Sequence, residues 1–537
     1  MFSKQFFGKL TWQILLLIVG MHLIAIVVRG SGFELPVLIG ISLITLFVSK
    51  ESLSTGLLLA FTEIFVGGHG HLIEASILGF SVSIRIVIFS AVMLAWLYLL
   101  LTKKLTIKFD SFRDTPWLIL LVAIVLGTGV GFLKNDFSKA FDDMNGYLTI
   151  FYLLPVISIN WNQLKKRELL QVFTGSTVWL VIFTLLLSYL FTHLDGKILS
   201  HIYTFVRDSR LAEVTLQTVA NNNGEVTNHL GAQLLGGSGY WYRIFMQSQI
   251  FVVIALSVLF SSMMIMWRNQ KLPDLVSILV IGTVSTTLLS MSRSFILGLG
   301  SALFIIWCLA FFEGKRPIFN IGKRLFKAIG LGLLGFGLAL FTVIFPFPAQ
   351  PNIQDAVFYS TSSDTNREVA VSSRWSLLTP MMTDIWQAPI VGNGFGHEVT
   401  YTSDDPRVRS AYEGGVVTTY RFEWGYQDLW LKMGILGLIA FAWYFAVMMV
   451  GVRFTMNNHG HSWLVLGLGG GLVILFISNI FSPYLNHPIG FAYMIFVVPF
   501  IDFKGMEKKR LMSKKTQIAQ VRNVVKMSPV LGSKIEG

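Results

Sequence analysis

Long apolar runs constrain the fold of this 537-residue chain more than any other feature. Apolar residues make up 53% of the sequence and charged residues only 13%, which is far from the composition of a soluble domain. A bilayer core of about 30 Å takes about 20 apolar residues per helix. Because a segment inside the bilayer must satisfy its own backbone hydrogen bonds, such runs predict membrane-spanning helices.

Fourteen runs of this kind can be drawn, several of them short. They cover residues 10–28, 33–49, 53–66, 83–101, 115–132, 145–159, 169–191, 244–267, 275–291, 295–312, 328–347, 435–452, 463–481 and 489–501. We therefore predict an all-α, polytopic integral membrane helix bundle of about 14 transmembrane helices. Residues 1–503 form a single transmembrane domain in this prediction. Residues 504–537 form a basic cytoplasmic tail whose polar composition is typical of disorder.

The distribution of charge predicts the orientation. With both termini cytoplasmic, the inner segments hold 27 of the 42 Lys and Arg residues and 9 of the 29 Asp and Glu residues, as the positive-inside rule requires. This excess, drawn to an anionic leaflet, accounts for the net charge of +13 without nucleic acid. The first apolar run continues past any cleavage motif, so it is predicted to be a retained helix. The single Cys308 excludes an intrachain disulfide and a thiolate metal site.

Two predicted extracytoplasmic loops, residues 192–243 and 348–428, are far longer than ordinary connections and therefore favour a function. The second is the most polar, aromatic-rich stretch of the chain. Within it, residues 373–387 place apolar side chains three and four positions apart, which predicts either an interfacial helix on the membrane or, equally, a helix packed on the bundle. Pro380 is expected to kink this helix or to begin a second one.

Three arginines are candidates for binding an anion. Arg293 lies beside the hydroxyls of a Ser-rich turn, a setting that suits phosphate or diphosphate, although snorkelling at a helix end is the alternative. Arg374, next to Trp375, is placed to meet the same anion or to face a lipid headgroup. Arg243 follows three aromatic residues, which favours an aromatic-belt anchor over a third phosphate contact.

The segment PIVGNGFGHE at 389–398 predicts a tight turn, because three glycines in five residues suit positive φ angles. A nucleotide-binding loop is excluded, since no strand precedes the glycines and no βαβ unit surrounds them. His397 in this segment is a candidate base, although a solvated loop histidine is the favoured interpretation.

Glu423 is the candidate catalytic base. It lies between Phe422 and Trp424 just before a predicted membrane helix, where partial desolvation would raise the pKa of its carboxyl. The alternative is an interfacial acid paired with Arg421, and Asp428 is close enough in sequence to compete for the role of base.

Charged and metal-ligating residues near the third and fourth predicted spans form a separate group. His69 and His71 have the spacing of a two-ligand metal clip, but no third ligand is evident nearby, so structural loop histidines are favoured. We predict no metal site. Glu63 and Arg85 are costly in lipid and are expected to face the bundle interior, either paired or lining a substrate path.

Four motifs in order resemble the bacterial O-antigen ligase and O-antigen polymerase superfamily of membrane glycosyltransferases. They are SRS at 292–294, RW at 374–375, PIVGNGFG at 389–396 and LKMGILGL at 431–438. The similarity is concentrated in residues 288–446. It implies an undecaprenyl-diphosphate-linked glycan donor and a glycan acceptor, handled on the outer face of a bacterial cytoplasmic membrane without metal or other cofactor. A flippase and a chain-length regulator of the same pathway are the implied protein partners.

The resemblance also implies roles for individual residues. Arg293 and Arg374 match the two arginines that hold the diphosphate. Ligase members carry a His–Asn pair eleven residues before the first glycine of the last motif, where this chain has Glu423 and Trp424. With Glu423 in place of the histidine, the resemblance favours a polymerase over a ligase. Further substrate contacts are expected from Arg243, His397, Arg421 and Trp424. A lipid-linked oligosaccharide transporter and a non-catalytic scaffold are the alternatives from other classes.

Overall fold

The computed structural model describes residues 3–77, 80–107, 109–194, 196–216, 242–265, 274–312, 318–347, 364–403, 408–409, 412–458 and 462–512. Of these residues, 79% are helical. Strands within the described ranges form only three two-stranded antiparallel sheets. The predicted all-α class is therefore confirmed.

The elements follow one another as a series of helices interrupted by short hairpins. The first half of the chain contains α1 (Ser3–Phe6), α2 (Lys9–Val28), α3 (Glu34–Glu51), α4 (Leu53–Val66), α5 (Ile84–Leu101), α6 (Ser111–Lys134), α7 (Phe137–Asn145), η1 (Gly146–Tyr152), α8 (Leu153–Ser158), α9 (Gln163–His193) and α10 (Gly196–Asp208). The second half contains η2 (Gln247–Gln249), α12 (Ile250–Ile265), α13 (Asp274–Leu289), α14 (Arg293–Phe312), α15 (Ile318–Ile344), α17 (Asp364–Gln387), η3 (Glu413–Gly415), α19 (Gly425–Asn458), α20 (Ser462–Ser478), η4 (Tyr484–Asn486), α21 (Pro488–Val497) and η5 (Val498–Phe500). The strand pairs are β1 (Glu74–Ile77) with β2 (Phe80–Ser83), β3 (Glu213–Leu216) with β4 (Tyr242–Phe245), and β5 (Val399–Thr402) with β6 (Val416–Thr419).

Several helices are long and apolar enough to cross a membrane, which indicates a membrane protein. Seven pass this test in the described ranges, and an eighth span results if Pro488–Phe500 and Phe503–Met512, bent by 59°, are joined. Four shorter apolar helices are Leu53–Val66, Asp274–Leu289, Arg293–Leu309 and Trp463–Ser478. Helices of 14 to 17 residues rise only about 21 to 26 Å, less than the bilayer core. Three expectations stay predictions: the number of fourteen spans, the side of the membrane on which the termini lie, and the boundary of the tail.

The centre of the bundle is α12, whose apolar window is 94% buried. It packs against α13, α14 and α20, and small residues bring α12 and α20 close together, as in many membrane helix pairs. The Ser257 hydroxyl donates to the carbonyl oxygen of Gly467 at 2.8 Å, and a Cβ at Gly467 would lie 2.5 Å from the Cα of Val258. By contrast, only 22% of the corresponding window of α15 is buried.

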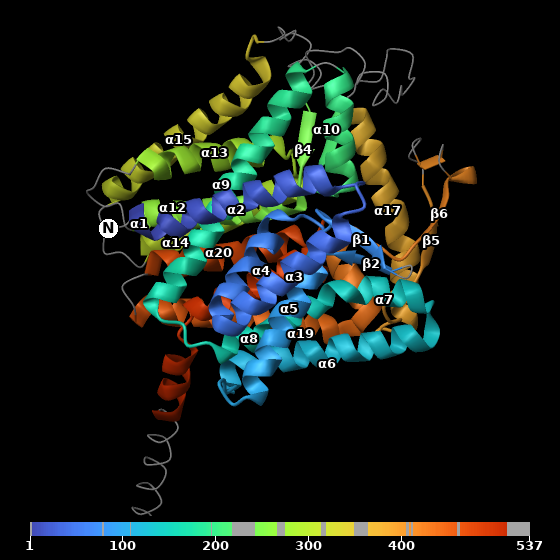
Figure 1. Ribbon diagram of the computed structural model, residues 1–537, viewed down its shortest axis with the longest axis horizontal. Helices are drawn as coiled ribbons and strands as arrows, with labels where there is room; N and C mark the ends of the chain where they lie inside the picture. Colours follow the sequence, from blue (N-terminus) through green and yellow to red (C-terminus); the bar gives the residue numbers. More distant parts are fainter. Residues whose placement is uncertain are drawn as a thin grey trace, which may run out of the picture.

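The two long predicted loops carry structure of their own at one end of the bundle. Figure 1 shows α17 and the β5–β6 hairpin together at that end. The loop at 192–243 contributes α10 and the β3–β4 pair, and its polar centre, NNNGEVTN at 221–228, lies outside the described residues. The β-pairs were not predicted.

The sequence allowed residues 373–387 to form either an interfacial helix on the membrane or a helix packed on the protein. In the structure this segment belongs to α17, which is packed on the protein. Leu377, Met381 and Ile385 are buried against a cluster that includes Val399 of β5 and Leu431 of α19. Helix α17 is one helix from Asp364 to Gln387 with Pro380 inside it, so the proline does not begin a second helix. The expected kink stays a prediction. Burial of the apolar face on both sides of Pro380 stabilises the continuous helix against the loss of one backbone hydrogen bond.

The glycine-rich segment 389–396 docks onto a break in α19. Three backbone hydrogen bonds join the two segments: Asn393 N to Leu431 O (2.7 Å), Gly394 N to Lys432 O (3.2 Å) and Ile435 N to Pro389 O (2.9 Å). The predicted positive φ angles are confirmed, since Gly392 has φ 86° and a Cβ there would lie 2.6 Å from the nitrogen of Gly434. Gly434 itself, with φ 65° and ψ −169°, interrupts α19.

Replacing Gly434 with alanine is expected to destabilise the fold. Its φ and ψ lie in a region that essentially only glycine adopts, which costs another residue about 1–3 kcal/mol. A Cβ there would also collide with the carbonyl oxygen of Ile390. We expect Gly434→Ala to lower the midpoint of thermal unfolding of the purified protein in detergent. Gly332→Ala is the matched control, because a Cβ on that residue of α15 meets nothing within 4 Å; equal midpoints for the two variants would contradict the docking described above.

Candidate functional site

Arg374 and Glu423 form an ion pair between α17 and the segment that precedes α19. The indole of Trp424 fixes their separation, since its Nε1 donates to the carbonyl oxygen of Arg374 at 2.9 Å, and its ring lies 5.1 Å from that of Trp375. The structure thus joins three predicted site residues. The side chain of Glu423, for which partial desolvation was expected, is 56% exposed.

Arg243 and Arg293 flank a second feature, the turn between α13 and α14. Arg243 Nε donates to the carbonyl oxygen of Ser290 at 3.0 Å, while Arg293 begins α14 three residues later with an exposed side chain. The guanidinium of Arg293 makes no ion pair or hydrogen bond with another described residue, which leaves it available to an anion. The serine hydroxyls expected to assist it are buried and bonded internally: Ser290 donates to Thr287, and Ser292 pairs with Ser294.

Glu213 of β3 connects these two features. Burial raises the pKa of the Glu213 carboxyl, the charge of Glu423 adds to the rise, and Arg243 opposes it. Both residues therefore lie within electrostatic reach of Glu213. We call the group formed by Glu213, Arg243, Arg293, Arg374 and Glu423 the outer site. It brings three of the predicted arginines and two carboxylates to one end of the bundle.

Tyr484 lies beside the outer site. Its ring is 5.8 Å from that of Phe295 on α14. Burial raises the pKa of its hydroxyl above the ordinary value, with Glu213 adding to the rise and Arg243 opposing it. The hydroxyl is buried without a hydrogen-bond partner among the described residues, as are Asn479 Nδ2 and Asn486 Oδ1 nearby in sequence. Buried polar atoms of this kind are normally satisfied by water or by a ligand.

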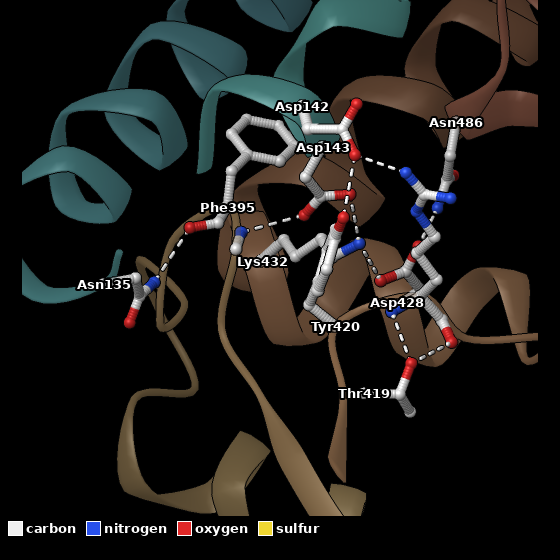
Figure 2. Close-up of polar contacts among 11 residues, drawn as sticks. Asn135, Asp142, Asp143, Phe395, Thr419, Tyr420, Asp428, Lys432 and Asn486 are labelled. Carbon is white, nitrogen blue, oxygen red and sulfur yellow. Dashed lines mark hydrogen bonds and ion pairs between the residues drawn. The ribbon is translucent and has the colours of Figure 1, made fainter. Parts of the chain in front are cut away.

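A buried charge network underlies the glycine-rich segment (Figure 2). The ammonium of Lys432 lies 2.7 Å from a carboxylate oxygen of Asp143 and 2.7 Å from one of Asp428. The other oxygen of Asp143 accepts from the backbone nitrogen of Gly396 at 2.9 Å. Asp428, considered above as a base, is therefore committed to a buried ion pair and also accepts from Asn486.

Arg421 pairs with Asp142 of α7, so its suggested pairing with Glu423 is wrong. The Tyr420 hydroxyl donates to the same carboxylate oxygen at 2.7 Å (Figure 2). Burial pushes the pKa of Asp142 upward, but Tyr420 and Arg421 outweigh it, and the net shift is downward. This contact ties the β5–β6 hairpin to α7 and gives Arg421 a structural partner.

His397 pairs with Asp384 of α17, with Nε2 and Oδ2 3.0 Å apart. Asp384 is ten residues from Arg374 on the same helix, which corresponds to about 15 Å along the axis. The structure thus places His397 beside α17 but away from the Arg374–Glu423 pair. A carboxylate partner of this kind orients an imidazole.

The group near α4 and α5 is a buried ion pair surrounded by histidines. Arg85 donates from Nε and Nη2 to the two oxygens of Glu63 at 2.9 and 3.0 Å, which confirms that they pair. The His69 ring lies 5.3 Å from that of His487, and burial, followed by the charge of Arg85, lowers the pKa of His69 to about 4. The described residues contain no group of three or more metal-ligating side chains.

Sequence analysis did not identify several residues that make ion pairs or charge contacts in this region. They are Glu213, Asp142, Asp143, Asp384 and Lys432. The carboxylate pair Asp142–Asp143 in a strongly amphipathic helix was a visible signal, as was Lys432 within an apolar run. Glu213 and Asp384 gave none, since their partners lie 30 and 13 residues away.

Comparison of the chain with family models and with curated proteins gave no match.

Replacing Lys432 with methionine is expected to be strongly destabilising. The two carboxylates would then face each other in a buried site without a cation, and breaking a buried pair in this way costs about 3–5 kcal/mol. Chemical unfolding of the purified protein measures the loss. Lys139→Met is the control, because its pair with Glu398 at 2.8 Å is exposed to solvent and contributes little. The triple variant with Lys432→Met, Asp143→Asn and Asp428→Asn should recover part of the loss; no difference between Lys432→Met and Lys139→Met would contradict the network.

The raised pKa of Glu213 predicts a pH-dependent stability. The native state holds this proton more tightly than the unfolded state, so Glu213 costs stability as pH rises from about 4.5, its ordinary value, through its native pKa. Glu213→Gln removes that cost. We expect its unfolding midpoint to exceed that of the wild type at pH 8 and to match it near pH 4. A uniform loss across pH in Glu213→Gln would refute this argument.

Proposed function

We propose that the protein is a membrane glycosyltransferase that polymerises undecaprenyl-diphosphate-linked oligosaccharide repeats into a surface polysaccharide. The observation that carries this proposal is the outer site, in which three arginines and two carboxylates from five chain segments lie at one end of an apolar helix bundle. Guanidinium groups bind diphosphate through paired hydrogen bonds. The motif resemblance supplies the lipid-linked substrate class.

In the proposed reaction, Arg293 and Arg374 bind the donor diphosphate, with Arg243 adding charge behind them. An acceptor hydroxyl oxygen attacks the anomeric carbon, the bond from that carbon to the diphosphate oxygen breaks, and its electron pair stays on the diphosphate. Arginines aimed at this leaving group stabilise the negative charge that develops there. Attack from the opposite face inverts the configuration at the anomeric carbon.

We assign to Glu213 the role of the base that accepts the proton of the acceptor hydroxyl. We assign to Glu423 a positioning role. Sequence reasoning favoured Glu423 as the base, but Glu423 is exposed and ion-paired with Arg374. Glu213 makes no ion pair with another described residue, and desolvation raises the pKa of its carboxyl, which suits a general base. Glu423 then orients Arg374 until the donor diphosphate replaces the Glu423 carboxylate as the partner of the guanidinium. On this assignment, Glu213→Gln abolishes turnover, whereas Glu423→Gln weakens donor binding.

The test is polymerisation of purified lipid-linked repeat by the purified protein in proteoliposomes, with product length read on gels. Arg293→Ala and Arg374→Ala should each reduce the rate about 10²–10³-fold, the usual effect of removing one charge-stabilising group. Arg207→Ala is the matched control, since Arg207 on α10 pairs with its exposed neighbour Asp208. Its rate should equal that of the wild type.

The same assay separates the alternatives. Long chains made by wild type and lost in both arginine variants support the proposal. Transfer of a single glycan to a terminal acceptor without chain growth indicates a ligase. Movement of intact donor across the vesicle membrane without any new glycosidic bond indicates a transporter, and wild-type chain lengths in Arg293→Ala would refute the role of that residue.

A further inference from the structure

A cavity of about 1340 Å³ lies at the other end of the bundle from the outer site. It is formed where the chain turns between α3 and α4, α5 and α6, and α8 and α9, with Gln5 and Lys504 contributing from the two ends of the described chain. Figure 1 shows α8 and the start of α9 at the end opposite the β5–β6 hairpin. The charge distribution of the sequence predicts this end to be cytoplasmic.

The cavity is separate from the outer site by about the thickness of a membrane. Lys166 lines the cavity near the start of α9, and Phe191 near the end of that helix packs its ring 5.6 Å from Tyr242, the neighbour of Arg243. The 25 residues between Lys166 and Phe191 correspond to about 38 Å of helix. A ligand in the cavity is therefore not a substrate held by the arginines of the outer site.

The wall of the cavity carries a strong excess of positive charge. Seven basic residues line it, against three carboxylates: Lys50, Lys104, Arg113, Lys165, Lys166, Arg167 and Lys504 against Glu51, Asp110 and Asp502. Two of the carboxylates are already engaged. Asp110 accepts from the backbone nitrogen of Arg113 at 3.2 Å, and Asp502 accepts from that of Gly505 at 3.0 Å. Arg113 pairs with Asp114, which does not line the cavity. Six basic residues therefore remain against the three carboxylates of the wall.

Lys165 and Lys166 are two of these cations, and the charge of Asp502 reaches Lys166. Neither makes an ion pair with another residue in the described part of the chain, and both are half-buried. They lie in the first turn of α9, which contains no acidic residue. The helix dipole already places positive potential there, so two ammonium groups in that turn are electrostatically unfavourable until an anion joins them.

Apolar side chains complete the lining, among them Leu53, Leu99, Leu105 and Phe500. A cavity lined by both cations and apolar groups matches a phospholipid, whose charged headgroup is attached to acyl chains. Basic pockets between membrane helices on the cytoplasmic side bind anionic headgroups in this way. A soluble phosphate compound would use the cations and leave the apolar groups unused.

We propose that this cavity binds the phosphate of an anionic ligand, with a phospholipid of the cytoplasmic leaflet as its source. The lipid joins the loops between three helix pairs and the segments around Gln5 and Lys504, and so stabilises the bundle at the end remote from the outer site. This inference is independent of the proposed glycosyltransferase activity.

The test uses the full-length protein purified in detergent and titrated with phosphatidylglycerol, phosphatidylcholine or inorganic pyrophosphate, with bound lipid counted by native mass spectrometry and stability followed by thermal unfolding. We expect tight retention of phosphatidylglycerol, a raised unfolding midpoint and no effect of phosphatidylcholine. Lys165→Gln with Lys166→Gln should weaken phosphatidylglycerol binding about thirtyfold.

The control removes the same charge from the same end of the bundle. Lys508 and Lys509 do not line the cavity, so Lys508→Gln with Lys509→Gln should bind phosphatidylglycerol as the wild type does. A second double variant, Lys104→Gln with Lys504→Gln, changes a different wall of the cavity and should also weaken phosphatidylglycerol binding. It replaces the Lys165→Gln, Lys166→Gln variant if that variant fails to fold. Stabilisation by pyrophosphate without lipid, lost in the same variants, would assign the cavity to a soluble phosphate compound. Equal losses in the control and the cavity variants, or no binding of either anion, would overturn the proposal.

Discussion

The docking of residues 389–396 onto the break at Gly434 is the constraint on which the Arg374–Glu423 end of the structure depends. The docked segment connects the end of α17 to β5, and β6 leads back through Glu423 into α19. The stretch from α17 to Gly434 is thereby closed on itself by backbone hydrogen bonds. Arg374 and Glu423, 49 residues apart in sequence, face each other because both belong to this closed unit.

The same unit is fixed to the bundle by buried charge. Asp143 on α7 bonds both to the backbone of Gly396 and to Lys432, so one carboxylate connects the glycine-rich segment, α19 and α7. Asn135, just after α6, adds a bond from its Nδ2 to the carbonyl oxygen of Phe395 at 2.8 Å. Removing Lys432 would leave the carboxylates of Asp143 and Asp428 without their cation, and Arg374 depends on this rigid support for its position.

Sequence reasoning reached the helical class, the positive φ angles of the glycine-rich segment and the Glu63–Arg85 pair, because each has a local signature. Composition marks apolar helices, glycine spacing marks a tight turn, and a lone charge in lipid requires a partner. It failed for Glu423 and Arg421, whose partners depend on how distant segments pack. Glu213 could not be identified from sequence for the same reason. The pairing of β3 with β4 sets Val214 opposite Ile244, 30 positions later, and so brings Glu213 near Arg243.

The central claim is that Arg293 and Arg374 bind one diphosphate between them. The most direct measurement compares the affinities of the purified protein, in wild-type and single-variant forms, for a short-chain prenyl diphosphate and for the matching monophosphate. Two cations on one ligand predict that the wild type binds the diphosphate about tenfold or more tightly than the monophosphate, and that Arg293→Ala and Arg374→Ala each lose this preference. A wild type without the preference, or either variant that keeps it, would contradict the claim.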